Sequence, residues 1–215
     1  MKLATFSAGG GSRPGLVDGE RIIDLSAGGG PATMRELIQA GPEAWALAEG
    51  RRRAPGAVSY SLDSVKLLAP LPDPPKIVAI GLNYMDHCRE QNVPVPDRPL
   101  VFAKFPSSII GPGEDIVWDP ALTQQVDFEA ELGVVIGRRA RRIGAERALD
   151  HVFGYTIVND ISARDIQFPD KQWVRGKSLD TFCPTGPFIV TADELPDPQA
   201  LAIRCTVNGR VLQDS

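Results

Sequence analysis

The chain has 215 residues, with 23 Lys plus Arg against 27 Asp plus Glu and a formal net charge of −4. This mild acidity argues against nucleic acid or a membrane surface as a partner, and no stretch approaches the roughly 18 uninterrupted apolar residues of a spanning helix. Three cysteines without Cys-x-x-Cys spacing predict a reducing, cytoplasmic location and no disulfide framework.

Residues 1–70 predict a small N-terminal α+β domain. Two short apolar runs flank Asp18-Gly19, which is the pattern of a β-hairpin around a tight turn. Thr33 opens a capping box for a helix, and Gly41 fits the end of that helix. The proline-rich segment 71–75 is stiff, and we place the domain boundary there.

Residues 71–215 predict a second, β-rich domain, which also carries the candidate chemical residues described below. Strands are expected at 76–81, 100–103, 155–158 and 201–207, and short helices at 83–91, at 145–151 and after a possible cap at Ser162. Near the end, Asn208-Gly209 is a strong hairpin signal with only a short return strand after it. We therefore expect this domain to lack its C-terminal part, which would leave an unpaired strand edge.

The acidic segment 126–132 carries the clearest chemical signal. Asp127, Glu129 and Glu131 alternate with apolar residues, so they are predicted on one face of a single strand. Neighbouring acids roughly 6.6 Å apart would repel by roughly 2.5 kcal/mol at an effective dielectric near 20. A half-buried strand therefore needs a cation, and oxygen ligands favour Mg²⁺, Mn²⁺ or Ca²⁺.

A fourth acid, Asp160, follows a buried strand. It could join Glu129 and Glu131 around one cation, although a helix cap or turn residue fits the spacing equally well. Arg164 and Gln167 are three residues apart on the following helix and share the face beside Asp160. Arg164 could bind a substrate carboxylate bidentately or form a salt bridge to the acids.

Two further groups are candidates for proton chemistry. His87 and Glu90 are three residues apart, and a carboxylate paired with one imidazole nitrogen leaves the other free to take a proton from water. Such pairs are also common on exposed helices, and the proline-rich loop 93–96 suggests a mobile lid. Lys177 follows Gly176, which permits close approach to a ligand, but most lysines are surface residues.

Together these segments resemble the fumarylacetoacetate hydrolase family over roughly residues 65 to 215. The matching motifs are Gly81-Leu82-Asn83-Tyr84 with Asp86-His87, Phe102-Ala103-Lys104 before Pro106-Ser107, the segment 128–135 with Glu129 and Glu131, Asn159-Asp160-Ile161-Ser162-Ala163-Arg164-Asp165 with Gln167, Gly176-Lys177-Ser178, and Val207-Asn208-Gly209. The resemblance implies an α+β, β-rich fold, a mixed β-sandwich roll, and a homodimer.

The resemblance also implies a site. Its divalent ion would be bound by Glu129, Glu131 and Asp160, with Lys177 facing the substrate and the His87–Glu90 pair on a lid. The residues expected to border the substrate pocket are Lys104, Ser107, Arg164 and Gln167. Fumarylacetoacetases proper carry a further metal-ligating Asp where this chain has Ile80, which points to the acylpyruvase or isomerase branch. The family's C-terminal Gly-Thr-Pro loop is absent from this chain.

We predict a metal-dependent hydrolase that cleaves a C–C bond in 2,4-dioxo acids of the acylpyruvate or fumarylpyruvate type, in the breakdown of aromatic compounds. His87, oriented by Glu90, would activate water, and Lys177 would stabilise negative charge. The same site would also serve keto–enol isomerisation, a 2-hydroxyhepta-2,4-diene-1,7-dioate isomerase or an oxaloacetate decarboxylase, since each passes through a metal-stabilised enolate. A non-catalytic, metal-stabilised binding domain is the alternative of another class.

Overall fold

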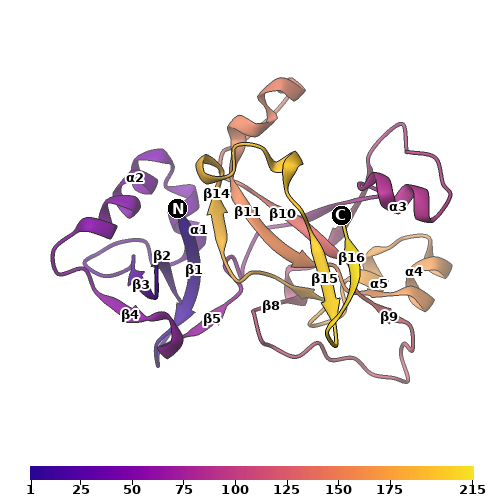
Figure 1. The fold of residues 1–215 in the computed structure, drawn as a ribbon, viewed down its shortest axis with the longest axis horizontal. Helices are drawn as coiled ribbons and strands as arrows, with labels where there is room; N and C mark the ends of the chain where they lie inside the picture. Colours follow the sequence, from indigo (N-terminus) through magenta and orange to yellow (C-terminus); the bar gives the residue numbers. More distant parts are fainter.

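The structure is a computed structural model that describes residues 1–215. An eight-stranded sheet dominates the fold, in the order β10-β11-β14-β1-β2-β3-β4, with β5 paired to β1 (Figure 1). Its strands are β1 (Lys2–Ser7), β2 (Arg13–Asp18), β3 (Arg21–Asp24), β4 (Ser59–Ser61), β5 (Lys66–Leu68), β10 (Ala130–Ile136), β11 (Val152–Asn159) and β14 (Ile189–Thr191).

Four strand pairs and five short α-helices complete the fold. The pairs are β6 (Ile77–Gly81) with β7 (Leu100–Lys104), β8 (Ile109–Ile110) with β13 (Cys183–Pro184), β9 (Val126–Asp127) with β12 (Ser162–Ala163), and β15 (Arg204–Val207) with β16 (Arg210–Asp214). The helices are α1 (Met34–Gln39), α2 (Pro42–Gly50), α3 (Met85–Glu90), α4 (Arg164–Asp170) and α5 (Val174–Lys177). No helix is long and apolar enough to cross a membrane.

Local signals in the N-terminal part are confirmed. Strands β2 and β3 form the predicted hairpin, and Gly19 takes the left-handed backbone of its turn, with a φ of 61°. Thr33 caps α1, because its Oγ1 accepts a hydrogen bond from the Glu36 backbone N–H at 3.1 Å. The predicted end of this helix near Gly41 also agrees with the structure, in which α1 stops at Gln39.

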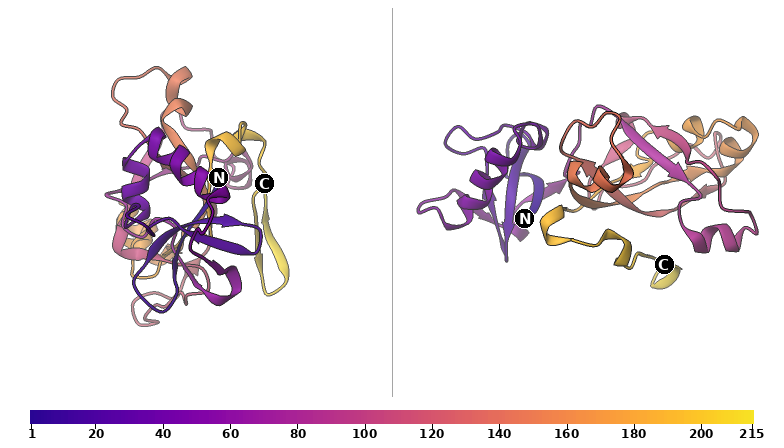
Figure 2. Two further views of the ribbon diagram at one scale, coloured as in Figure 1. Left: turned by 90° about the vertical axis from the view of Figure 1, so that its left-hand side faces the viewer. Right: turned by 90° about the horizontal axis from the view of Figure 1, so that it is seen from above.

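The N-terminal and later parts of the chain share one sheet and one core. Strand β1 pairs with β14, with Lys2 opposite Val190. A core cluster of twelve buried residues combines Leu3 and Leu37 with Phe153. Figure 1 shows the N-terminal segment at one end, β14, β11 and β10 in the middle, and α3, α4 and α5 at the other end, and Figure 2 gives two further views. The division at residues 71–75 stays a prediction.

The acidic segment does not form one continuous strand, so that prediction is wrong. Strand β9 pairs with β12, whereas β10 pairs with β11, and Phe128 and Glu129 lie between the two strands. The acidic segment changes its strand partner just after the end of β11. At this point the Asp160 N–H donates to the Glu129 carbonyl at 2.9 Å. Asp127 therefore does not share a strand face with Glu129 and Glu131.

Three further observations concern short elements. Ser162 lies in β12, and Ala163 is the N-cap of α4, so the predicted Ser162 cap is wrong. The helix expected at 145–151 is a 3₁₀ helix. The terminal hairpin is confirmed, with φ of 50° at Asn208 and 78° at Gly209, but β15 begins at Arg204 and not at residue 201.

Candidate active site

A buried lysine lies at the centre of the candidate site. The Lys177 ammonium donates to Glu129 Oε2 at 2.9 Å, to Asp160 Oδ2 at 2.7 Å and to Ser162 Oγ at 2.8 Å. Lys177 is 1% exposed, and its Nζ lies 5.1 Å from the centre of the Phe102 ring. Such an environment fixes the ammonium and removes it from bulk water.

Close packing of α5 against α4 brings this lysine into place. A Cβ at Gly176 would lie 2.8 Å from the Gln167 backbone nitrogen and 3.0 Å from the Ala163 carbonyl oxygen. Any larger side chain at residue 176 would therefore push the two helices apart. The glycine beside Lys177 permits contact between two helices, whereas the sequence suggested contact with a ligand.

A second buried lysine holds the other oxygen of Asp160. Lys104 Nζ lies 2.6 Å from Asp160 Oδ1, and it also donates to the carbonyls of Ile161 and Lys177. An ammonium has three N–H donors, so protein groups use all three and none is free for the substrate. Burial lowers the pKa of Lys104, and Asp160 opposes this effect.

Arg164 forms the salt bridge to the acids that the sequence left open. Its Nε and Nη2 donate to Asp127 Oδ2 at 3.0 and 2.7 Å. Its Nη1 lies 2.7 Å from Glu129 Oε1 and donates to Gln167 Oε1 at 2.9 Å. Asp127 thus positions an arginine beside the acid cluster.

Glu131 is the acid whose ionisation the site perturbs most. Burial, followed by the charges of Glu129 and Asp160, raises its pKa to about 7, against a lowering effect of the Tyr84 hydroxyl. Glu131 forms no ion pair, whereas Lys177 bridges Glu129 and Asp160. An additional cation would relieve this repulsion.

Glu129, Glu131 and Asp160 offer the type of ligand atom that a divalent cation needs. As the side chains stand, no group of three His, Cys, Asp or Glu residues is arranged to hold a metal ion. The Lys177 ammonium lies between Glu129 and Asp160 and acts as a stand-in cation there. The donors are carboxylate oxygens, which Mg²⁺ and Mn²⁺ prefer.

The His87–Glu90 pair and Ser107 lie apart from this cluster. His87 Nδ1 is 3.8 Å from Glu90 Oε2, and the two side chains are 40% and 81% exposed. His87 Nε2 lies 3.2 Å from the Gln91 side-chain amide, so the polar contacts of this histidine stay within its own segment. Ser107 is exposed. The structure brings neither His87 nor Ser107 into contact with the acids.

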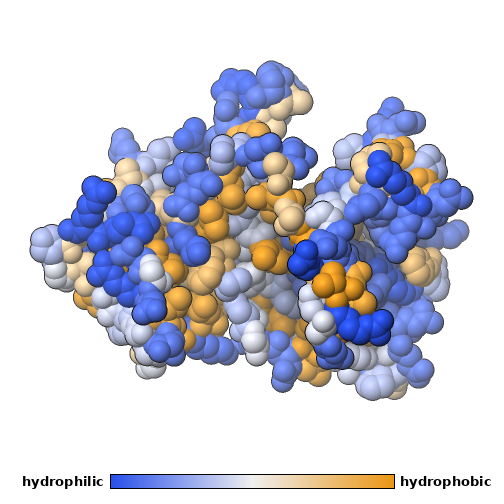
Figure 3. Space-filling view, in the orientation of Figure 1, coloured by the Kyte–Doolittle hydropathy of each residue, from blue (hydrophilic) through white to orange (hydrophobic).

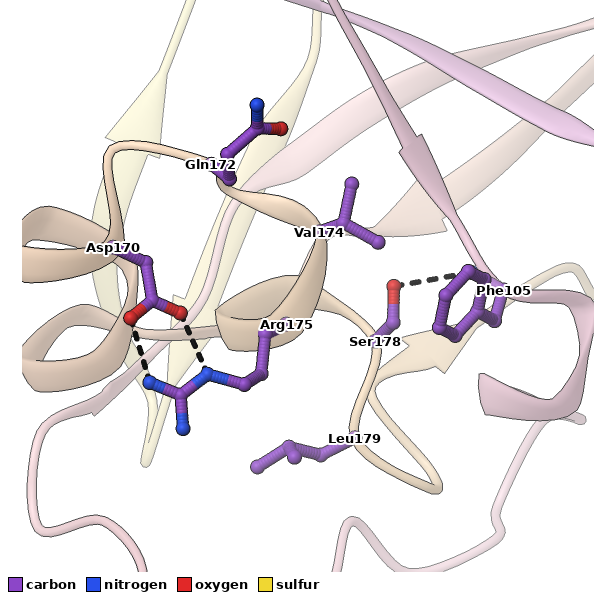
Figure 4. Close-up of a pocket in the computed structure, with 7 residues that line it drawn as sticks. All are labelled: Phe105, Asp170, Gln172, Val174, Arg175, Ser178 and Leu179. Carbon is purple, nitrogen blue, oxygen red and sulfur yellow. Dashed lines mark hydrogen bonds and ion pairs between the residues drawn. The ribbon is translucent and has the colours of Figure 1, made fainter.

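A surface pocket of about 490 Å³ lies next to the two lysine segments (Figure 4). It is lined by Phe105, Asp170, Gln172, Val174, Arg175, Ser178 and Leu179, and by none of the predicted site residues. Arg175 and Asp170 pair within it through two hydrogen bonds of 2.6 Å. Because these charges satisfy each other, the pocket offers no free charged group to a ligand.

Ser162 and Tyr84 contact the site, although the sequence assigned a role there to neither. Ser162 alternates with Asp160 along an extended segment, so the period of two could have indicated a shared face. No local signal pointed to Tyr84, whose hydroxyl accepts a hydrogen bond from Leu132 N–H at 3.1 Å, 48 residues away in the chain.

Comparison with known proteins shows where this arrangement belongs. The family model described as fumarylacetoacetate (FAA) hydrolase C-terminal matches residues 76–215. The chain belongs to the fumarylacetoacetate hydrolase family. This family member is 46% identical over 223 residues to the mitochondrial oxaloacetate tautomerase fahd2 of Xenopus laevis, covering 100% of the chain and 69% of the relative. It is 42% identical to the oxaloacetate tautomerase YisK of Bacillus subtilis, covering 92% and 72%.

Solved structures of the same family share the fold. A fumarylacetoacetate hydrolase from Exiguobacterium antarcticum is 38% identical with a TM-score of 0.85, covering 100% of this chain and 75% of that one. A maleylpyruvate hydrolase from Sphingobium, solved with manganese(II) and pyruvate, is 32% identical with a TM-score of 0.81, covering 100% and 76%. The predicted α+β, β-rich fold and the prediction of a family enzyme are confirmed.

Proposed function

We propose that this fumarylacetoacetate hydrolase family enzyme interconverts the keto and enol forms of a 2-oxo dicarboxylic acid of the oxaloacetate type, with a divalent metal ion. The observation that carries the proposal is the composition of the buried cluster. Lys177, Glu129, Asp160 and Ser162 can hold a proton and stabilise an enolate, and no histidine lies among them. Relatives named oxaloacetate tautomerases, up to 46% identical, support this reaction.

Glu129, Glu131 and Asp160 are the residues that would hold the metal, either Mg²⁺ or Mn²⁺. A bound divalent ion supplies a Lewis acid that polarises the 2-oxo group and lowers the free energy of the enolate. The manganese in the Sphingobium maleylpyruvate hydrolase supports a divalent ion in this family member.

We assign the proton transfer to Lys177. In the forward reaction the carbon beside the carbonyl loses a proton, the C–H electron pair becomes the C=C bond, and the carbonyl oxygen takes up a proton. The buried Lys177 ammonium can give a proton to the carbonyl oxygen, and the neutral amine so formed can take the proton that leaves the carbon, which restores the ammonium. Before it gives up its proton, the ammonium offsets the negative charge that develops on the substrate oxygen. Arg164 would bind a substrate carboxylate by exchanging its hydrogen bond to Gln167.

Hydrolysis of a 2,4-dioxo acid is the second candidate, and the His87–Glu90 pair favours it. Glu90 Oε2 lies 3.8 Å from Nδ1, and a closer approach that forms a hydrogen bond would make the imidazole a base for water. Water would add across the C–C bond, with its hydroxyl on the distal carbonyl carbon and its proton on the released enolate. This reaction needs His87 to approach the cluster, whereas tautomerisation does not.

Two measurements test the proposal. With Mn²⁺ or Mg²⁺, the protein should speed the loss of the ultraviolet absorbance of enol-oxaloacetate above the spontaneous rate. The variants Lys177→Met and Glu131→Gln should lower kcat/KM by about 10² to 10⁴. The matched control is Glu20→Gln, which changes an exposed acid in the β2–β3 turn and should behave as the parent.

Calorimetry with Mn²⁺ tests the ligands separately from the reaction. Glu129→Ala and Glu131→Ala should each weaken binding at least about tenfold, the lower end of losses seen around metal sites, whereas Glu20→Ala should not. Parent-like Mn²⁺ affinity in Glu131→Ala would contradict the assigned ligands. If the parent protein does not speed the conversion of enol-oxaloacetate above its spontaneous rate, the proposed tautomerase activity is wrong.

We also propose the homodimer that the family resemblance predicts. Val78, Ile80 and Val101 are 56%, 40% and 66% exposed on one face of the β6–β7 ribbon. Figure 3 shows a further gathering of hydrophobic residues in the middle of the molecule. Exposed apolar surface of this kind is typical of interfaces. Light scattering should give twice the chain mass, and a monomer at micromolar concentration would contradict it. A cytoplasmic location stays a prediction.

A further inference from the structure

The outer edge of β10 is occupied by side chains. On its other edge β10 pairs with β11. On the outer edge the Leu132 N–H donates to the Tyr84 hydroxyl at 3.1 Å, and the Ala130 N–H donates to Gln213 Oε1 at 2.8 Å. Glu131 lies between these two amides. The backbone on both sides of this acid is therefore held by side chains from distant segments.

The Tyr84 hydroxyl lies on the strand directly beside Glu131. Its oxygen accepts the Leu132 N–H at 3.1 Å, so its own hydrogen is free for another acceptor. The phenol therefore holds the backbone of the residue that follows Glu131.

The same tyrosine begins α3. Tyr84 is the N-cap of this helix, and its carbonyl accepts the Cys88 N–H at 3.2 Å. The segment is bounded by two residues with left-handed backbone, Leu82 with a φ of 51° and Asn92 with a φ of 50°. Residues other than glycine adopt this region rarely, so these two positions mark the ends of the α3 segment.

Tyr84 is the residue of this segment whose side chain contacts β10 directly. The buried Cys88 thiol donates to the Leu82 carbonyl at 3.6 Å, and Gln91 contacts His87 at 3.2 Å, both within the segment. The Tyr84 hydroxyl reaches the strand that carries Glu131. A shift of β10 at Glu131 can therefore act on α3, which carries His87, through this phenol.

We propose that Tyr84 is a positioning residue that links α3 to Glu131: its hydroxyl holds the β10 backbone beside this acid and, through the same hydrogen bond, the helix that carries His87. The inference rests on the proposed metal site. It assigns to a tyrosine the task of joining the metal-binding acid to the segment predicted to act as a lid.

The variant Tyr84→Phe removes only the hydroxyl, and Tyr60→Phe is the matched control. Tyr60 OH accepts from Arg13 Nη1 at 3.0 Å in the N-terminal part of the chain. Loss of the hydrogen bond beside Glu131 should weaken Mn²⁺ binding about fivefold in Tyr84→Phe, whereas Tyr60→Phe should keep the parent affinity. Because the metal site serves substrate binding, KM should rise more than kcat falls.

Hydrogen exchange reports on the link directly. Without metal, the amides of Leu132 and of residues 85–91 should exchange faster in Tyr84→Phe than in the parent. Addition of Mn²⁺ should slow exchange in residues 85–91 of the parent and leave Tyr84→Phe unchanged.

A double-mutant cycle with Glu131→Gln keeps the test decisive if Tyr84→Phe is unstable. Urea unfolding should give non-additive effects for the two changes, as residues in contact do. Additive effects, or parent-like Mn²⁺ affinity and exchange in Tyr84→Phe, would overturn the role of Tyr84. A parent that binds no Mn²⁺ would overturn the proposed function instead, and the metal-free exchange and the cycle would still decide the link.

Discussion

Two buried lysines share the carboxylate of Asp160, one on each oxygen. Lys104 lies 2.6 Å from Oδ1 and Lys177 lies 2.7 Å from Oδ2. The other two acceptors of Lys104 are backbone carbonyls, which cannot move away. Those of Lys177 are the side chains of Glu129 and Ser162, which can exchange partners. We infer that Lys104 has a structural role and Lys177 a chemical one.

Replacing Lys104 should therefore act on stability. Lys104→Met leaves Asp160 buried with one partner fewer, and breaking a buried pair costs about 3–5 kcal/mol. Urea unfolding should show this loss, and Asp160→Asn combined with Lys104→Met should cost less than the sum of the two single changes. Lys66→Met, which breaks an exposed pair with Glu114, should cost no more than about 1 kcal/mol. A loss that small in Lys104→Met would refute the structural role.

Replacing His87 should separate the candidate reactions. Hydrolysis of an acylpyruvate needs an activated water, so His87→Ala should lower its kcat by about 10² to 10⁴. Tautomerisation of oxaloacetate needs no water, and oxaloacetate decarboxylation needs only an electron sink, so both should survive. Glu131→Ala should abolish all three. Equal losses of hydrolysis and tautomerisation in His87→Ala, with Mn²⁺ binding intact, would make His87 a general proton carrier.

At the scale of elements, a buried aspartate ends β3. Asp24 is 4% exposed and accepts from the backbone and hydroxyl of Ser26 at 2.9 and 2.6 Å and from Arg13 at 3.1 Å. Burial alone raises the pKa of Asp24, but the hydrogen bonds from Ser26 and Arg13 outweigh burial and lower it below its usual value. The ionised carboxylate therefore stabilises the folded state.

The stabilisation by Asp24 should depend on pH in a known direction. A carboxyl with a lowered folded-state pKa stabilises above its unfolded pKa of about 3.9, and the effect is lost as pH falls through the folded pKa. Asp24→Asn should cost about 1–3 kcal/mol at pH 7. In urea unfolding at pH 7, 4 and 3 the difference from the parent should shrink. A constant difference would show that the charge contributes nothing.

At the scale of the molecule, the shared sheet joins the N-terminal part to the part with the active site. Leu3 and Ile189 are fully buried in the same core cluster, although 186 positions separate them. Strand β14 lies between β11, whose end carries Asp160, and β1. Loss of packing in the N-terminal part should therefore affect the strands that carry the acids.

We expect the two parts to unfold together. Leu3→Ala should lower stability by about 2–5 kcal/mol, and far-ultraviolet circular dichroism and tryptophan fluorescence should still give one coincident transition. Leu47→Ala, at a position 75% exposed, is the matched control and should stay within about 0.5 kcal/mol of the parent. Two separate transitions in the parent would show that residues 1–70 fold independently.

The sequence by itself determined the local elements and the family. The Asp18-Gly19 and Asn208-Gly209 hairpins follow from turn residues, and the start of α1 follows from the Thr33 cap, since these choices depend on neighbours along the chain. The family followed from motifs that include the Glu129–Glu131 segment and the segment around Asp160.

Only the tertiary structure decided which of these groups meet. The family motifs placed Lys104 at the border of the substrate pocket, but its ion pair with Asp160 forms because β7 ends beside α5. The break after Asp127 and the contact of Tyr84 with β10 likewise depend on partners 30 residues or more away. Local propensity cannot specify them, because the free energy that selects such partners comes from burying and pairing groups across the whole fold.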